Sequence, residues 1–145
     1  MNKKIVLSIN LALLTIIFVV SYMIFKSPKE TTYAAFMDEI LEGDTVKSII
    51  IKDFENPEPK NHLLIEDKGI LQAIVEQPAE MKLKETDDYP DDLYSLSMHT
   101  NKKDIVFIIG VNNVIRISGI EDGPKYYLVE GENTLFRILI EVTKK

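Results

Sequence analysis

The chain has 145 residues and a net charge of −6, and it contains no cysteine and no tryptophan. A chain of this length has room for one domain of ordinary size. The absence of cysteine excludes a disulfide framework, a thiolate metal site, a cysteine nucleophile and a cysteine-linked lipid. The fold must therefore be held by packing and hydrogen bonds.

The charges are distributed unevenly along the chain. Four lysines, Lys3, Lys4, Lys26 and Lys29, flank an apolar run near the N-terminus. Residues 31–145 carry 13 basic and 22 acidic side chains, a net charge of −9. A region this acidic repels phosphate backbones and anionic lipid surfaces. We therefore expect no nucleic-acid partner.

The apolar run from Ile5 to Phe25 holds 21 residues without a charge. As a helix it would reach about 31 Å, which matches the hydrocarbon core of a bilayer. Cleavable signal peptides have a shorter apolar region of about 7 to 15 residues, followed closely by small residues. The sequence thus predicts an uncleaved signal-anchor in residues 1–30, with the membrane as a partner. Cleavage near Ala34 would instead give a secreted domain.

The basic residues around the run also predict its orientation. The positive-inside rule applies to Lys3 and Lys4 on one side and to Lys26 and Lys29 on the other. Keeping the short basic N-terminus in the cytoplasm and exporting the acidic domain, residues 31–145, is the simpler outcome. We expect a single-pass protein of the cell membrane with an extracytoplasmic C-terminal domain.

The first element predicted after the span is a short amphipathic helix in TTYAAFMDEILEGD. Thr32 is expected to cap its N-terminus and Gly43 to end it. An interfacial membrane helix would need a basic polar face, whereas this one is acidic. Its apolar residues lie at helical spacing and are expected to pack in the core: Tyr33, Phe36, Met37, Ile40 and Leu41.

The middle of the chain predicts two strands, a helix and a third strand. VKSIIIKDF and HLLIED read as strands joined by a proline-containing turn. DKGILQAIVEQP reads as a helix capped by Asp67 and ended by Pro78. In EMKLKE, Met81 and Leu83 alternate with lysines, a pattern typical of an edge strand over residues 81–85.

The second half is more plainly β. LYSLSMHT alternates, DIVFIIGV is nearly all apolar, and Asn112 with Asn113 supplies a turn into VIRISGI. EDGP turns the chain into KYYLVEG, and ENTLFRILIEV predicts a last helix that packs across the sheet. The predicted class is α+β: an N-terminal transmembrane helix followed by a mostly antiparallel sheet with helices on one face.

A cluster of carboxylates in ETDDYPDDLY is the most suggestive loop for a ligand. Carboxylate oxygens are what a hard cation such as calcium needs, so Asp87, Asp88, Asp91 and Asp92 are candidate metal ligands. The spacing is not that of an EF-hand, and no glycine folds the loop around an ion. A solvated turn is the simpler interpretation, and a cation-responsive sensor is kept as an alternative function.

His62 and His99 are the only histidines. Either could act as a general base beside a carboxylate. No second histidine or cysteine stands at metal-ligand spacing, and neither a serine elbow nor a glycine-rich phosphate loop is present. We therefore expect no enzyme activity and no cofactor, and a small envelope enzyme remains the alternative.

Four residues are predicted as contact residues for a partner. Met81 and Leu83 belong to the predicted edge strand, which could pair with another chain. Tyr126 and Tyr127 lie in an alternating strand, so one faces the core and the other faces out. The outward tyrosine is useful for binding because an aromatic ring gives a large contact area with a polar tip.

The whole layout, a lysine-flanked span followed by an acidic α+β domain without cysteine, resembles the small single-pass exported proteins of bacilli. The resemblance covers the architecture and no diagnostic motif, and it implies an envelope location without catalytic residues. The predicted function is that of an anchored binding domain, which contacts another envelope protein or a second copy of itself.

Overall fold

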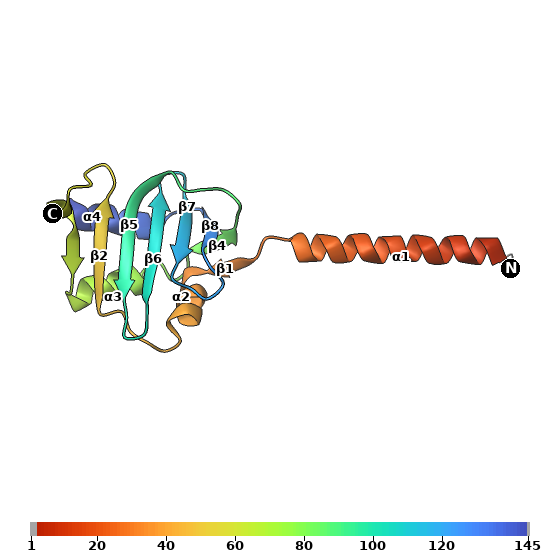
Figure 1. Cartoon of the computed structure of the whole chain (residues 1–145), viewed down its shortest axis with the longest axis horizontal. Coiled ribbons are helices and arrows are strands. Elements are labelled where there is room, and N and C mark those ends of the chain that lie inside the picture. The colour runs from red at the N-terminus through yellow and green to blue at the C-terminus, as the bar shows by residue number, and fades with distance from the viewer. Residues whose placement is uncertain (1–2, 145) are drawn as a thin grey trace.

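The computed structural model describes residues 3–144 and, within the first helix, the side chains of residues 9–24. That helix, α1 (Lys3–Lys26), projects away from a single domain that contains all the other elements (Figure 1). Within the stretch of α1 whose side chains are described, and in every later helix, no segment is both long and apolar enough to cross a membrane.

The domain is built on one sheet of eight strands. In chain order the strands are β1 (Glu30–Thr32), β2 (Ser48–Asp53), β3 (Leu63–Ile65), β4 (Lys82–Glu85), β5 (Asp92–His99), β6 (Asp104–Gly110), β7 (Val114–Ser118) and β8 (Lys125–Glu130). Their order across the sheet is β1-β4-β8-β7-β6-β5-β2-β3, and every neighbouring pair is antiparallel. The predicted α+β class with an antiparallel sheet is confirmed.

Three helices accompany the sheet: α2 (Tyr33–Leu41), α3 (Lys68–Glu76) and α4 (Thr134–Thr143). Each begins at a side chain that accepts a hydrogen bond from an otherwise unpaired backbone N–H. Thr32 accepts from Ala35 N at 3.2 Å, as the sequence predicted. Asp67 and Asn133 do the same for α3 and α4, at 3.0 and 2.9 Å. A short 3-10 helix (Pro59–Asn61) lies in the turn between β2 and β3.

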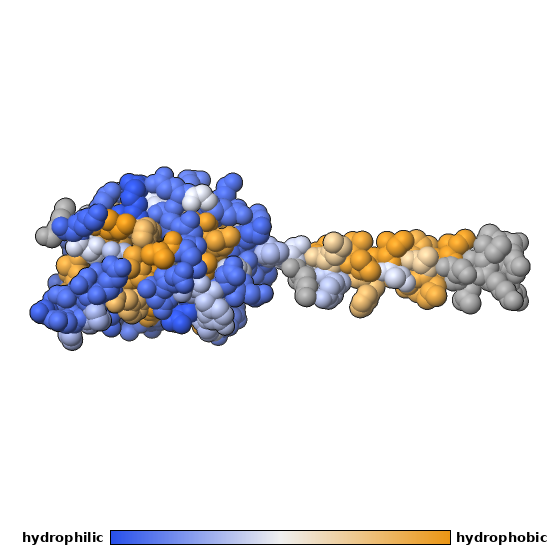
Figure 2. All heavy atoms as spheres, turned by 90° about the horizontal axis from the view of Figure 1, so that it is seen from above, coloured by the Kyte–Doolittle hydropathy of each residue, from blue (hydrophilic) through white to orange (hydrophobic). Residues whose placement is uncertain are grey.

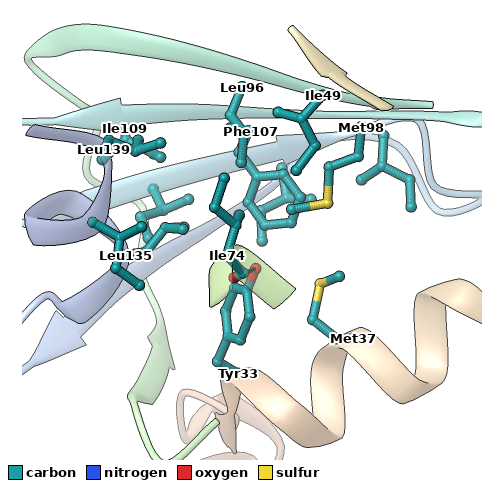
Figure 3. Packing of buried hydrophobic residues seen from close by; sticks show 14 of the residues in the cluster. Tyr33, Met37, Ile49, Ile74, Leu96, Met98, Phe107, Ile109, Leu135 and Leu139 are labelled. Carbon is teal, nitrogen blue, oxygen red and sulfur yellow. Dashed lines mark hydrogen bonds between the residues drawn. The ribbon is translucent and has the colours of Figure 1, made fainter. Parts of the chain in front are cut away.

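The three helices pack on the same face of the sheet, which we call the covered face. Figure 1 shows α3 and α4 behind the strands, and ring pairs join the helices to the strands. Phe36 of α2 meets Tyr127 of β8 at 5.4 Å between ring centroids, and Tyr94 of β5 meets Phe136 of α4 at 6.0 Å. The largest side chains with almost no exposure come from this layer (Figure 3): Tyr33, Phe107, Ile49, Ile51, Ile74, Leu83, Leu96, Met98, Ile105, Ile109, Ile115 and Ile117.

Tyr33 fixes α2 against α3 through one buried hydrogen bond. Its hydroxyl donates to the carbonyl of Ile74 at 3.2 Å, and Figure 3 shows the two residues together in the core. Within α3 the carbonyl of Ile74 would accept from residue 78, but Pro78 has no N–H to donate. The tyrosine therefore supplies the donor that the proline lacks. Burial of the ring raises the pKa of the Tyr33 hydroxyl well above its usual value.

The predicted edge strand at residues 81–85 is wrong. β4 lies inside the sheet because β1 pairs with it, with Thr31 opposite Leu83, and β8 covers its other side. No strand was expected here, because β1 spans the junction between the predicted anchor, residues 1–30, and the helix that Thr32 caps. Its three residues carry no alternation that would have marked a strand. The two edges of the sheet are β1, beside α1, and β3, at the far end (Figure 1).

Candidate binding face

The face of the sheet opposite the helices carries two central rows of side chains, which together we call the open face. The first row crosses from β3 to β7, and the second crosses from β2 to β8. Antiparallel pairing places the members of a row directly opposite one another on adjacent strands. The rows are Leu64, Ile50, Ser97, Val106 and Ser118, and Lys52, Ser95, Ile108, Arg116 and Tyr126.

The open face differs in composition from the rest of this acidic protein. Its ten residues are four aliphatic side chains, one tyrosine, three serines, one lysine and one arginine, with no carboxylate. Leu64 is 56% exposed although it is fully apolar. Acidic side chains in the neighbouring rows have basic partners: Asp104 accepts from His99 at 2.8 Å, and Glu30 and Glu130 flank Lys84 at 3.8 and 3.7 Å. The two rows therefore form a mixed apolar and basic surface.

Arg116 belongs to β7, the fourth of the eight strands across the sheet, and lies opposite Ile108 on one side and Tyr126 on the other. Its Nε atom is shut off from solvent and has no hydrogen-bond acceptor, and the side chain as a whole stays partly exposed. Among residues 3–144 no carboxylate forms an ion pair with it. A desolvated donor without an acceptor costs about 1–3 kcal/mol, more when the group is charged.

One end of the open face is closed by a loop, residues 86–91, that links β4 to β5. Tyr89 of this loop packs edge-on against Tyr126, with ring centroids 5.0 Å apart. Asn112 holds the loop by donating to the carbonyl of Tyr89 at 2.9 Å and accepting from Asp91 N at 3.0 Å. The loop passes so close to β6 that a Cβ at Gly110 would lie 2.6 Å from Asp91 N. Tyr89 itself is 72% exposed.

A depression of about 770 Å³ lies beside the loop, near the start of the domain. It is lined by Tyr126 and Leu128 of β8, by residues 84–88, and by Ser27 and Pro28 of the link to α1. Its lysines are already engaged, since Lys84 sits between Glu30 and Glu130, and Lys125 lies 3.5 Å from Asp122. The depression is therefore a poor anion site, but it extends the surface around Tyr126.

The predicted contact residues fall into two groups. Met81, Leu83 and Tyr127 are 6%, 1% and 4% exposed, so burial leaves them almost no surface for a partner. Burial, with smaller effects from the charges of Glu85 and Glu39, raises the pKa of Tyr127 to about 12. Tyr126 is on the open face, which confirms the prediction that one tyrosine faces the core and the other faces out.

The aspartate loop does not assemble a metal site in the described part of the chain. No group of three or more histidine, aspartate or glutamate side chains there is arranged to hold an ion. Asp87 and Asp88 line the depression, whereas Asp91 and Asp92 follow the proline that leads into β5. Instead, Tyr89 of the loop packs against Tyr126 at the end of the open face.

The two histidines belong to separate sites: His99 ends β5, and His62 precedes β3. His99 pairs with Asp104 on the neighbouring strand, and Ser48 stands opposite it on β2. His62 and Asp53 line a separate depression of about 460 Å³ next to α4. The carboxylate of Asp53 accepts from Glu55 N and from Asn56. Neither histidine has a hydrogen-bonded hydroxyl among residues 3–144, so neither site shows an activated nucleophile.

Sequence reasoning missed Arg116 and Tyr89. Arg116 is a single charge inside the apolar strand VIRIS, which already indicates an outward-facing position. Its isolation from carboxylates depends on the register of β6, β7 and β8, which the sequence does not supply. Tyr89 stands in an acidic loop, and its contact with Tyr126 joins residues far apart in the chain.

Comparison with known proteins gives a fold and no family. No family model matches the chain, and no curated protein matches it significantly. A crystal structure described as a putative lipoprotein from Clostridium perfringens matches with a TM-score of 0.57 and 15% sequence identity. The match covers 77% of this chain and 93% of the other. At this identity the likeness shows a similar fold alone.

Proposed function

We propose that this protein is a binding domain held at the outer side of the cell membrane by residues 5–25, and that it contacts another protein through the open face. The observation that carries the binding function is the open face itself. It combines one exposed and several half-buried apolar side chains, a tyrosine that pairs with Tyr89, and an arginine without an ion pair in the described chain. Such a combination is typical of contact surfaces, where tyrosine and arginine are enriched.

The anchor is supported by the sequence from Ile5 to Phe25 and by the form of α1. The helix has 24 residues and extends from the domain without folding back on it (Figure 1). Figure 2 shows that the drawn surface of α1 is largely hydrophobic, whereas the surface of the domain is mostly hydrophilic. An isolated helix with such a surface is unfavourable in water and favourable in a bilayer.

The fold neighbour supports the same location in a limited way. The Clostridium perfringens protein is described as a putative lipoprotein. This chain has no cysteine that could carry a lipid, so in our proposal the apolar run takes the place of a lipid.

Binding is favoured over catalysis by the geometry of the polar groups. The His99–Asp104 pair and the depression at His62 lie apart from each other, whereas the open face is one continuous surface across the centre of the sheet. Its ten residues come from six strands, so they are held in fixed relative positions. A rigid surface loses little conformational entropy on binding, which favours affinity.

Location and contact are tested by two measurements on the full chain in its own membranes. The intact mass, with protease accessibility of a C-terminal tag in wall-stripped cells, tests the anchor and the orientation. We expect the full-length mass and a digestible tag. A mass lacking roughly the first 34 residues would mean a secreted domain, as expected for cleavage near Ala34, and a protected tag would place the domain in the cytoplasm.

The contact is tested by photo-crosslinking from p-benzoylphenylalanine at position 126, with position 72 as the control. Gln72 is exposed on α3, on the helix side of the sheet. We expect one dominant protein adduct from position 126 and none of that mass from position 72. The same adduct from both positions, or no adduct from position 126, would contradict a contact through the open face.

A further inference from the structure

We infer that the partner of the open face presents a carboxylate, aspartate or glutamate, to the guanidinium of Arg116. This inference rests on the proposed function and names the chemistry of the partner. The starting observation is that the two arginines of the chain have opposite environments. Arg137 on α4 pairs with Glu132 at 2.8 Å and with Glu141 at 3.6 Å. Arg116 has no counter-charge within the described residues.

The surroundings of Arg116 make an incoming carboxylate favourable. Two neighbours on the same face are apolar and almost fully buried: Ile108, opposite Arg116 on β6, is 5% exposed, and Val114, two residues before it on β7, is 2% exposed. Charged hydrogen bonds are stronger where water is partly excluded, and guanidinium binds carboxylate in a planar, bidentate geometry. A carboxylate of the partner would supply the counter-charge that Arg116 lacks within the described residues of the domain.

Charge complementarity also selects between possible occupants. A second copy docked face to face would place Lys52 and Arg116 of one chain against Lys52 and Arg116 of the other. No acidic residue in either row would balance these charges. Like charges across an interface cost several kcal/mol. A lipid surface is disfavoured because residues 31–145 carry a net charge of −9. A carboxylate on a different protein does not bring these cations together, and at Arg116 it is affected mainly by the nearby positive charge, because exposed charges more than about 10 Å away are largely screened.

The experiment repeats the position-126 crosslink in full-length protein with three variants. Arg116→Gln removes the charge, Arg116→Lys keeps the charge but loses the bidentate geometry, and Arg137→Gln is the control that removes the other arginine. We expect the yield of the partner adduct to fall at least about tenfold with Arg116→Gln, because losing one member of a desolvated ion pair costs more than a factor of ten in affinity. The lysine variant should give an intermediate yield, and Arg137→Gln should match the wild type.

The outcomes separate the inference from the function on which it rests. If the wild type gives no protein adduct, the binding function fails. If the adduct forms equally well with Arg116→Gln, the binding function stands and the carboxylate partner is wrong. An adduct of twice the chain mass, or an adduct with lipid, would replace the acidic protein by a second copy or by the membrane. Equal thermal unfolding midpoints of the four proteins exclude a folding defect as the cause of a lost adduct.

Discussion

The two faces of the sheet use the same strands for different purposes. On the covered face, alternate residues of β2, β5, β6 and β7 are isoleucine, leucine, methionine and phenylalanine with almost no exposure. On the open face, the residues between them are serine, valine, isoleucine, lysine and arginine, mostly half-exposed. Ile50 and Ile51 are neighbours in the chain and belong to opposite faces. The covered face accounts for stability, and the open face is available for recognition.

This comparison teaches that burial and hydrogen-bond satisfaction must be considered together. The covered face is mainly apolar, and the fully buried hydroxyl of Tyr33 within it has an acceptor. The open face leaves an arginine Nε without an acceptor. A domain that only needed to be stable would have little reason to keep that group, since an apolar side chain of similar size would avoid the cost.

The largest effect on stability is expected when an isoleucine is shortened to alanine, once on the covered face and once on the open face. Ile51→Ala should destabilise the protein by about 2–5 kcal/mol, because it opens a cavity in a packed core. Ile50→Ala should cost less than about 1 kcal/mol, since the side chain is already half-exposed. Urea unfolding of the purified chain, followed by tyrosine fluorescence, measures both. Equal costs would mean that the open face is covered in solution.

A second effect is expected where the loop crosses the open face. Gly110→Ala should destabilise by about 1–3 kcal/mol, because the new Cβ would overlap the backbone at Asp91 and the ring of Pro90. The loop must then move outward, which separates Tyr89 from Tyr126. The near-ultraviolet circular dichroism of the tyrosines should decrease.

Gly123→Ala is the control for adding a methyl group, because a Cβ there meets no atom within 4 Å, although its φ of +82° adds local strain. An unchanged tyrosine signal in Gly110→Ala would show that the loop does not depend on this close approach.

A third effect isolates one hydrogen bond on the covered side. Tyr33→Phe keeps the ring but leaves the carbonyl of Ile74 without a donor, since Pro78 cannot supply one. We expect a loss of about 1–2 kcal/mol in the free energy of unfolding. Pairing the change with Pro78→Ala, which restores a backbone N–H at position 78, should recover part of the loss. No recovery in the double variant would argue against this account of the bond.

The smallest effect concerns Asp44, which ties the loop after α2 to the hairpin between β5 and β6. Its carboxylate accepts from Asn101 at 2.6 Å, Thr45 N at 2.8 Å and Lys102 N at 3.1 Å. The Asn101 bond is the main cause that holds the pKa of Asp44 well below its usual range.

A folded-state pKa below the unfolded one contributes stability that is present above the unfolded value, about 3.9, and is lost as the pH falls toward the folded value. The difference in unfolding temperature between wild type and Asp44→Asn should therefore be small, greatest near neutral pH, and absent in strong acid. A difference that grew on acidification would contradict the lowered pKa.

The strands with clear alternation could be predicted from the sequence, and so could the helices with a capping residue. β5 through β8 and all three domain helices appear where the pattern placed them. β1 could not be predicted, because Glu30, Thr31 and Thr32 give no periodic signal, and its absence made β4 look like an edge. Tyr126 was identified as one of two alternatives, and the register showed which tyrosine faces out. Arg116 required knowledge of three strands at once, which only the folded chain provides.

The position of β1 has a mechanical consequence for a chain held at its N-terminal end. β1 is joined to the sheet by three residue pairs with β4 and by the bond from Glu85 N to the carbonyl of Lys29 at 2.8 Å. Figure 1 shows that α1 leaves the domain directly before β1, so traction along α1 would act on β1 before any other strand. Release of three residues would lengthen the link by about 10 Å while the buried core stayed intact. β1 would then act as a short extensible tether that sets how far from its attachment the domain can reach.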